Sequence, residues 1–152
     1  MGYSFFSPGL SARNAVLNRI NNANDFVIGL LNSYESGEIH LAMLEAQDRT
    51  GLVYLIFDRR IPFLQGPRLD ELLDHGAVPL VDTSCRRVFS QYLIIDEFWI
   101  VSGSYLYSHL YDDHYTSDLN LLDYSNEYTL HSNDWNYHYD HSQLYTGIWP
   151  PA

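Results

Sequence analysis

Short apolar runs alternate with segments of helical spacing along the first half of the chain. The apolar runs that predict strands are 3–6, 25–31, 52–57 and 78–81. The segments that predict helices are 11–22, 36–50 and 68–75. Ser11 is the expected N-cap of the first helix, and Gly51 and Gly76 are expected to end the other two. Residues 58–67 are predicted to form a loop. This alternation indicates an α/β fold with a mixed sheet and helices on both faces.

Residues 88–101 have the pattern of a hairpin. Val88 to Ile95 and Phe98 to Val101 are rich in β-forming residues, and Asp96-Glu97 between them is typical of a tight turn. Strand alternation places Phe89, Gln91, Leu93 and Ile95 on one face. The opposite face carries Tyr92, Ile94 and Asp96. The hairpin leads directly into Gly103-Ser104.

The C-terminal part of the chain changes in composition. Leu119 to Leu122 is predicted to be the last core strand, and residues 125–145 are dense in Asn, Asp, His, Ser and Tyr. A helix with an aromatic stripe is one interpretation, since four residues recur at helical spacing: Tyr128, Ser132, Trp135 and Tyr139. The helix propensity of these residue types is low, so packing would have to hold such a helix. Trp149-Pro150-Pro151 predicts an extended tail.

Length and charge narrow the classes of function. At 152 residues with 46% hydrophobic content, the chain is expected to be one folded domain spanning 1–152, with a polar segment at 125–152. The formal net charge is −11 at pH 7, so the chain repels polyanions at long range unless one patch departs from the average. Free nucleic acid is therefore not an expected partner, whereas a basic protein fits the charge. Solubility alone is the simpler explanation of the same charge.

The expected location of the protein is the cytoplasm. Cys85 is the only cysteine, which excludes an intrachain disulfide and gives no sign of an oxidising compartment. The first residues have neither a basic region nor a long apolar stretch typical of a secretory signal. No apolar run approaches the roughly 20 residues of a membrane span, so no membrane association is predicted.

The layout of residues 86–107 resembles the signature of the phospholipase D superfamily, in particular its short single-motif bacterial nucleases. That signature is His-x-Lys, four residues, Asp, six residues, then Gly-Ser-x-Asn. Asp96, Gly103 and Ser104 occupy their places with the spacing intact, but Phe89, Gln91 and Leu106 replace the His, Lys and Asn. A carboxylate that the family carries further on falls near Ser117, with Asp118 beside it. The resemblance extends from Phe6 to about Tyr124 and implies an α-β-α sandwich.

The chemistry of this family requires the residues that are missing here. One His attacks phosphorus, a second protonates the leaving oxygen, and the Lys and Asn hold the non-bridging oxygens. A Phe side chain has no lone pair, a Gln side chain has no charge, and the chain contains no Lys at all. We therefore expect no catalytic residue, no cofactor and no metal. The residues expected to form a binding surface at the degenerate motif are Phe89, Gln91, Asp96, Ser104, Tyr105 and Tyr107.

Several functions fit a motif of this kind. Because single-motif members of the family place the motifs of two subunits face to face, the resemblance implies a homodimer in which Phe89 meets its counterpart. A converted binding site is the alternative explanation of Phe89 and Gln91. The expected function is binding to a protein of unknown identity, for example as an acidic inhibitor or decoy of a nucleic-acid-processing enzyme. An accessory subunit that docks through its Tyr-rich tail is the second version.

An enzyme with relocated chemistry is the rival from another class, for example a phosphodiesterase that uses His109 or His114 with a metal. The wider set of candidate ligands is His109, His114, His131, His138, His141, Asp112, Asp113, Asp118, Asp134 and Asp140. None has the compact spacing of a zinc protease, so a polar surface is the favoured explanation.

Two further groups have competing interpretations. The tyrosines after the Gly-Ser step form either a recognition surface or core packing: Tyr105, Tyr107, Tyr111 and Tyr115. The same question is open for the tyrosines of the C-terminal segment: Tyr137, Tyr139 and Tyr145. The basic pairs Arg59-Arg60 and Arg86-Arg87 are expected to neutralise acidic residues rather than to hold a phosphate.

Overall fold

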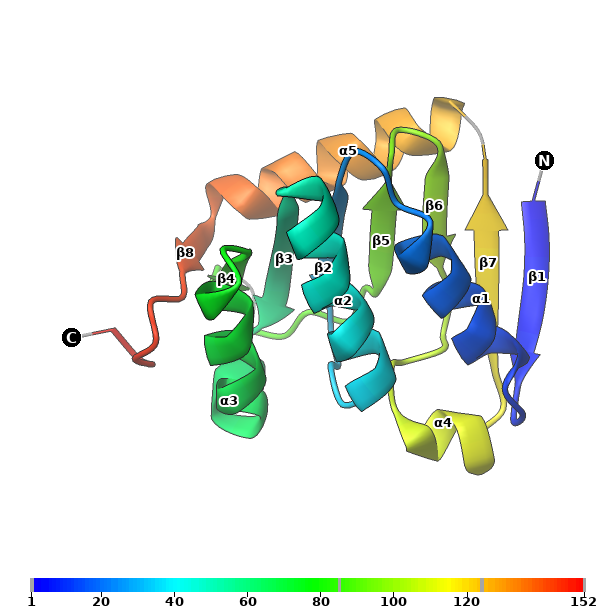
Figure 1. Cartoon of the computed structure of the whole chain (residues 1–152), viewed down its shortest axis with the longest axis horizontal. Helices are drawn as coiled ribbons and strands as arrows, with labels where there is room; N and C mark the ends of the chain where they lie inside the picture. The colour runs from blue at the N-terminus through cyan, green and yellow to red at the C-terminus, as the bar shows by residue number, and fades with distance from the viewer. Residues whose placement is uncertain (1, 85, 124, 152) are drawn as a thin grey trace.

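A mixed sheet runs through the whole molecule in the order β1-β7-β6-β5-β2-β3-β4-β8 (Figure 1). The computed structural model describes residues 2–84, 86–123 and 125–151, so Cys85 and Tyr124, named above, lie outside the described residues. The strands are β1 (Gly2–Ser7), β2 (Val27–Leu31), β3 (Val53–Asp58), β4 (Val78–Asp82), β5 (Tyr92–Ile95), β6 (Trp99–Ser102), β7 (Ser117–Leu122) and β8 (Ser142–Leu144). The helices are α1 (Ser11–Asn21), α2 (Gly37–Thr50), α3 (Ile61–Asp74), α4 (His109–Asp113) and α5 (Ser125–Asp140). Only the β2-β3 and β3-β4 pairs are parallel among the described strands.

Helices cover both faces of the sheet, which confirms the predicted α/β sandwich. Helices α1, α2 and α3 lie on one face and α5 on the other (Figure 1). Leu93 and Ile95 belong to the core under α1 and α2, whereas Tyr92 and Ile94 belong to the core under α5. The predicted alternation along this strand is therefore confirmed.

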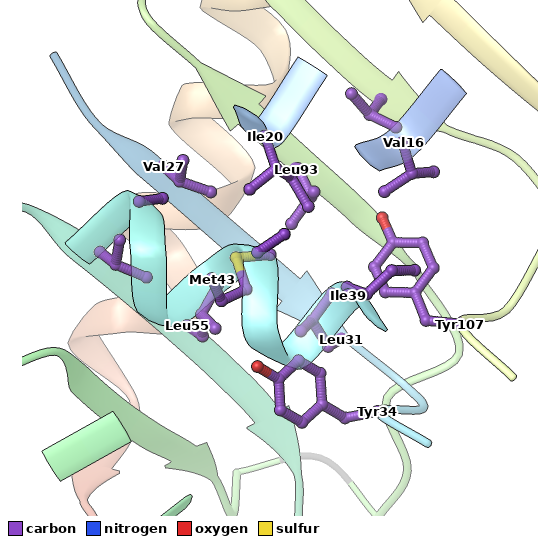
Figure 2. Packing of buried hydrophobic residues seen from close by; sticks show 14 of the residues in the cluster. Val16, Ile20, Val27, Leu31, Tyr34, Ile39, Met43, Leu55, Leu93 and Tyr107 are labelled. Atoms are coloured by element: carbon purple, nitrogen blue, oxygen red, sulfur yellow. The ribbon is translucent and has the colours of Figure 1, made fainter. Parts of the chain in front are cut away.

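The larger core is built from aliphatic residues of α1 and α2 against the sheet. Figure 2 shows Val16 and Ile20 of α1 and Met43 of α2 meeting side chains from the central strands, with Tyr34 and Tyr107 at one end of the cluster. All five of these residues are at most 1% exposed. This packing fixes the strands whose carboxyl ends carry the candidate site.

The predicted loop at 58–67 is wrong after Arg60, because α3 begins at Ile61. Pro62 lies in the first turn, where a backbone N–H has no helical partner, so proline is tolerated there. A kink at Gln65 (φ −132°, ψ 31°) separates this turn from the rest of the helix and accommodates Pro67. The predicted cap at Ser11 is also wrong: Leu10 is the N-cap.

Most of the C-terminal segment is helical (α5), in agreement with the interpretation of a helix with an aromatic stripe. The indole Nε1 of Trp135 donates to the carbonyl of Gly29 at 2.8 Å, and its ring stacks on Tyr139 at 5.3 Å. Residues 119–122 lie in β7, and Leu119 and Leu121 belong to the larger core, as predicted for the last core strand. The sequence did not predict β8, a strand with no buried residue that follows α5 and pairs with β4. Trp149 packs against the larger core rather than extending freely.

No helix among the described residues is long and apolar enough to cross a membrane.

Candidate functional site

The carboxyl ends of the parallel strands β2, β3 and β4 lie at one edge of the sheet, and the chain between β4 and β5, described at 83–84 and 86–91, lies along this edge. The sequence predicted a strand from Val88, but β5 begins only at Tyr92. Side chains, not a neighbouring strand, hold this part of the loop. The carboxylate of Asp58 accepts from the backbone N–H of Val88 at 2.7 Å, and the amide of Asn32 donates to the carbonyl of Val88.

Asp58, at the end of β3, is a fully buried anchor for this loop. Its Oδ1 accepts from the backbone N–H of Arg60 at 2.9 Å and from the Arg60 Nε at 2.8 Å. The Nε of Arg87 lies 3.7 Å from Oδ2. Burial raises the pKa of Asp58, but the bonds from Arg60 and Val88 outweigh burial and bring the pKa below its ordinary value. The carboxylate is therefore charged at neutral pH and fixes two arginines.

Asp82, at the end of β4, is the register neighbour of Asp58 and is also fully buried. Its Oδ1 accepts from the backbone N–H and the hydroxyl of Ser84 at 2.9 and 2.6 Å. Its Oδ2 lies 2.5 Å from Nδ1 of His138 on α5. Burial raises the pKa of Asp82, but the bonds with Ser84 and His138 bring it below the ordinary value. Nothing in the sequence indicated this pairing.

Asp96, which keeps its place in the motif, serves the backbone of a neighbouring loop. Its Oδ2 accepts from the N–H of Asn24 at 2.8 Å, and its Oδ1 accepts from those of Asp25 and Phe26 at 2.7 and 3.1 Å. Asp96 itself is the first of the three residues between β5 and β6, with φ of 60°. Its carboxylate therefore joins the β5-β6 turn to the start of β2.

Gly103 and Ser104, the other retained motif residues, hold the chain against β7. Gly103 has φ of +124°, and a Cβ at this position would collide with the backbone carbonyl of Asp118. The hydroxyl of Ser104 donates to Asp118 Oδ1 at 2.5 Å and accepts from the Asp118 N–H at 3.0 Å. The Ser104 hydroxyl is the main cause that lowers the pKa of Asp118. Asp118 is therefore a structural partner of the Gly-Ser step.

The substituted motif positions are arranged differently. The Phe89 ring is 76% exposed, with the Arg87 guanidinium 5.1 Å from its centre. Gln91 is buried and turned inward: its Oε1 accepts from the N–H groups of Asn32 and Ser33 at 2.6 and 3.3 Å, and its Nε2 donates to the Ser33 carbonyl. The Gln91 amide thus closes the end of β2 against the loop. Both polar atoms of the Gln91 side chain are therefore engaged by backbone groups.

A cavity of about 190 Å³ lies beside these residues. Its lining is Asn32, Ser33, Glu35, Arg60, Ile61, Leu64, Leu106, Ser108, Leu110 and Tyr111. Leu106, at the motif position of Asn, contributes an aliphatic wall where the family has an amide. The lining carries one cation, Arg60, and one carboxylate, Glu35, and none of these described residues is a His. The cavity therefore has one guanidinium group and an otherwise uncharged or apolar lining apart from Glu35. It lacks the pair of histidines that would act as nucleophile and general acid.

The tyrosines after the Gly-Ser step divide into two pairs. Tyr105 and Tyr107 are at most 1% exposed, and burial raises the pKa of both phenols. The Tyr105 hydroxyl donates to Asp112 at 2.7 Å. These two rings are core residues and do not form an accessible binding surface. Tyr111 and Tyr115 stack edge to face at 5.1 Å, and Tyr115 is 48% exposed.

The candidate metal ligands are dispersed. His109 lies 3.4 Å from Glu38 and 3.7 Å from Asp112, and His138 lies 3.7 Å from Asp134 in addition to its bond with Asp82. Within the part of the chain that the structure describes, no three His, Cys, Asp or Glu side chains are placed to share a metal ion. Neither His109 nor His114 lines the motif cavity.

The two arginine pairs are only partly neutralised. Arg60 and Arg87 contact Asp58 as expected. Arg59 donates to the backbone carbonyl of Thr83 at 3.0 Å and has no carboxylate within ion-pair distance among the described residues. Arg86 likewise has no carboxylate within ion-pair distance among the described residues, so the expectation that both pairs neutralise acidic side chains is wrong for Arg59 and Arg86.

Comparison with known proteins identifies the fold. No family model and no curated protein matches the sequence. Nuc of Salmonella typhimurium, described as a phospholipase D family member, has a TM-score of 0.88 at 17% identity, covering 95% of this chain and 97% of Nuc. NucT of Helicobacter pylori has a TM-score of 0.76 at 15% identity, covering 95% and 99%. The archaeal chromatin protein TrmBL2, whose structure is described as showing a novel mode of DNA binding, has a TM-score of 0.67 at 11% identity, covering 93% and 53%. The chain therefore has the fold of the phospholipase D superfamily.

Proposed function

We propose that this chain is a catalytically silent phospholipase D-like domain that acts by binding protein, and that it forms a homodimer through the degenerate motif. The observation that carries this proposal is the arrangement of Phe89 and Gln91. An exposed aromatic ring replaces the nucleophile, and a buried amide that serves only the backbone replaces the cation. Phosphoryl transfer needs a nucleophile and positive charge at these points.

The division between kept and lost residues supports the same proposal. Asp96, Gly103 and Ser104 each hold two segments of backbone together, so the fold itself explains their retention. In the family, the His, Lys and Asn positions serve the substrate. Phe89 and Leu106, in the His and Asn positions, make no polar side-chain contact. This is the pattern expected when a fold is maintained and its chemistry is not.

Apolar exposure at the motif face supports a protein partner. Phe89, Leu64 and Leu110 are 76%, 60% and 49% exposed, and the two leucines line the motif cavity. Aromatic and aliphatic side chains of this kind form the centres of protein interfaces. A second copy, related by a two-fold axis, would bring two such faces together.

Light scattering with matched variants tests the dimer. We expect a dimer at micromolar concentration and a monomer for Phe89→Asp, because two carboxylates would face each other at the interface. Phe98→Asp is the control: Phe98 is 68% exposed but follows the turn at the opposite end of β5, so this variant should remain dimeric. A monomeric parent protein, or equal effects of the two changes, would contradict the proposal.

An activity assay tests catalytic silence. Purified protein is incubated with single- and double-stranded DNA, with and without Mg²⁺, Mn²⁺ or Zn²⁺, and we expect no turnover. Robust cleavage that is abolished by His109→Ala or His114→Ala would replace this proposal with an enzyme of relocated chemistry.

An acidic decoy is the second candidate, and the surface of α2 and α3 favours it. The exposed carboxylates on these helices are Glu38, Glu45, Asp48, Asp70, Glu71 and Asp74. The arginines of the same helices point to backbone carbonyls instead: Arg49 bonds to those of Ile20 and Ala23, and Arg68 to that of Tyr34. Exposed carboxylates on two adjacent helices suit the basic groove of a nucleic-acid-processing enzyme.

Inhibition of DNA-cleaving enzymes tests the decoy. We expect the protein to slow at least one member of a panel of purified restriction endonucleases and exonucleases, and expect the Glu45→Gln/Asp74→Asn variant to weaken that inhibition. The matched control, Asp134→Asn/Asp140→Asn, removes the same charge from α5 on the other face of the sheet. Inhibition that depends equally on both pairs, or none across the panel, would count against a specific acidic face.

A further inference from the structure

A second hollow lies next to the motif cavity and shares only Arg60 with it. Its volume is about 360 Å³, and its lining is Arg59, Arg60, Phe63, Thr83 and Trp149. These residues come from the end of β3, the first turn of α3, the segment after β4 and the C-terminal tail. The volume is within the range of small-molecule sites, roughly 300–1,000 Å³.

The charge of this hollow departs from that of the rest of the chain. Its lining holds two guanidinium groups and no carboxylate, although the net charge of the protein is −11. Arg59 has one N–H engaged by the Thr83 carbonyl and no acidic partner among the described residues. Arg60 directs its Nε to Asp58, and that carboxylate holds the guanidinium in place. Fixed guanidiniums are suited to the oxygens of a phosphate.

The remaining walls are aromatic. The Phe63 ring is 67% exposed and belongs to neither of the two apolar cores of the described residues. Trp149 packs against the larger core, so its ring is held at the rim of the hollow by the body of the protein. Aromatic rings beside guanidinium groups provide a stacking surface for a flat ring and a charge for an attached anion.

We propose that this hollow binds a nucleoside monophosphate group, with the base against Phe63 and Trp149 and the phosphate on Arg59 and Arg60. The group could be a free mononucleotide or the 5′-phosphorylated end of a strand, which have the same chemistry at this scale. One phosphate and one ring suffice, so the acidic surface elsewhere does not prevent binding. The proposal involves no covalent step and does not depend on the dimer or on the silence of the motif.

Calorimetric titration of the full chain tests the site. Adenosine 5′-monophosphate should bind at least about tenfold more tightly than inorganic phosphate or adenosine, because it engages both parts of the hollow. Arg59→Gln should weaken binding about tenfold or more through loss of a charged hydrogen bond. Phe63→Leu should weaken it about fivefold or more through loss of stacking. Arg86→Gln is the matched control, since Arg86 is exposed on the same loop edge but outside the hollow, and should change binding less than about twofold.

Three outcomes would overturn the proposal: adenosine monophosphate binding no more tightly than phosphate, equal losses for Arg59→Gln and Arg86→Gln, or no effect of Phe63→Leu. All three changed residues are exposed, so circular dichroism should report folded variants. Quenching of tryptophan fluorescence by the nucleotide, but not by phosphate, provides a readout in the unchanged protein. A 5′-phosphorylated trinucleotide that binds more tightly than the monophosphate identifies a strand end as the ligand, and equal affinity identifies the free nucleotide.

Discussion

The imidazole Nδ1 of His138 lies 2.5 Å from Oδ2 of Asp82, and this contact joins α5 to the end of β4. The other Asp82 oxygen is occupied by Ser84, at the start of the loop that carries the degenerate motif. The helix on one face of the sheet and the motif loop therefore share one buried carboxylate.

Loss of this imidazole should destabilise the fold. His138→Leu removes one partner of a fully buried charge, so we expect the free energy of unfolding to fall by about 2 kcal/mol. His141→Leu is the control: this exposed His, just beyond α5, contacts the backbone carbonyl and the ring of Tyr137, and its loss should cost less than about 0.5 kcal/mol. Urea denaturation measures the free energy of unfolding of both variants. Equal losses would show that the contact of His138 with Asp82 does not stabilise the fold.

Acid should weaken the protein through its two buried carboxylates. Both Asp58 and Asp82 have pKa values below the ordinary one, so the unfolded chain binds protons at a higher pH than the folded chain does. The stability that they contribute is present above about pH 4, the unfolded pKa, and is lost as the pH falls through the folded pKa. Urea midpoints between pH 7 and pH 2.5 should reveal this decline. If the Asp58→Asn/Asp82→Asn variant loses stability with falling pH to the same extent as the parent protein, other groups cause the decline.

Two glycine substitutions separate a required glycine from a replaceable one. Gly103→Ala places a Cβ against the Asp118 carbonyl at a positive φ, and we expect a loss of about 3 kcal/mol or more. Gly66→Ala places a Cβ in open space within α3, where alanine favours the helix by up to about 1 kcal/mol. The thermal denaturation midpoint should therefore fall for Gly103→Ala and rise for Gly66→Ala. A stable Gly103→Ala variant would mean that the fold does not explain the retained glycine.

Restoring the lysine of the motif should damage the protein rather than revive it. Gln91→Lys removes the acceptor for Asn32 and Ser33 and buries a charge, so we expect a loss of about 2 kcal/mol or more. Phe89→His, at a position that is exposed in the single chain, should change the folding free energy of the monomer by less than about 0.5 kcal/mol. Neither change alone should produce DNA cleavage. A Gln91→Lys protein as stable as the parent would show that the inward amide is dispensable.

Much of the sheet was predictable because burial on two faces produces a strong pattern. The continuous apolar run at 52–57 and the alternation from Leu93 to Ile95 reflect local strand geometry. Both could therefore be predicted without knowledge of any tertiary contact. The spacing from Asp96 to Gly103 could also be recognised in the sequence, because strand β6 fills the interval between the turn and the Gly-Ser step.

The remaining features depend on partners far away in the chain. Residues 88–91 have β-forming side chains, but Asp58 and Asn32 occupy the backbone groups of Val88. The pairing of β8 with β4 and the contact of His138 with Asp82 join segments more than 50 residues apart. No local pattern encodes such pairings, so the helical spacing from Tyr128 to Tyr139 was visible in the sequence but the strand after it was not.

The three-residue strand β8 closes the outer side of β4, and the Tyr145 N–H continues the seal by donating to the Pro79 carbonyl at 3.0 Å. Without this cover, β4 would present a row of unpaired backbone groups above an apolar interior, which is a template for fibre growth between molecules. A protein shortened after Asp140 should therefore precipitate on storage. Residues 142–145 therefore protect the β4 edge from pairing with a strand of another molecule, a contact distinct from the proposed dimer face.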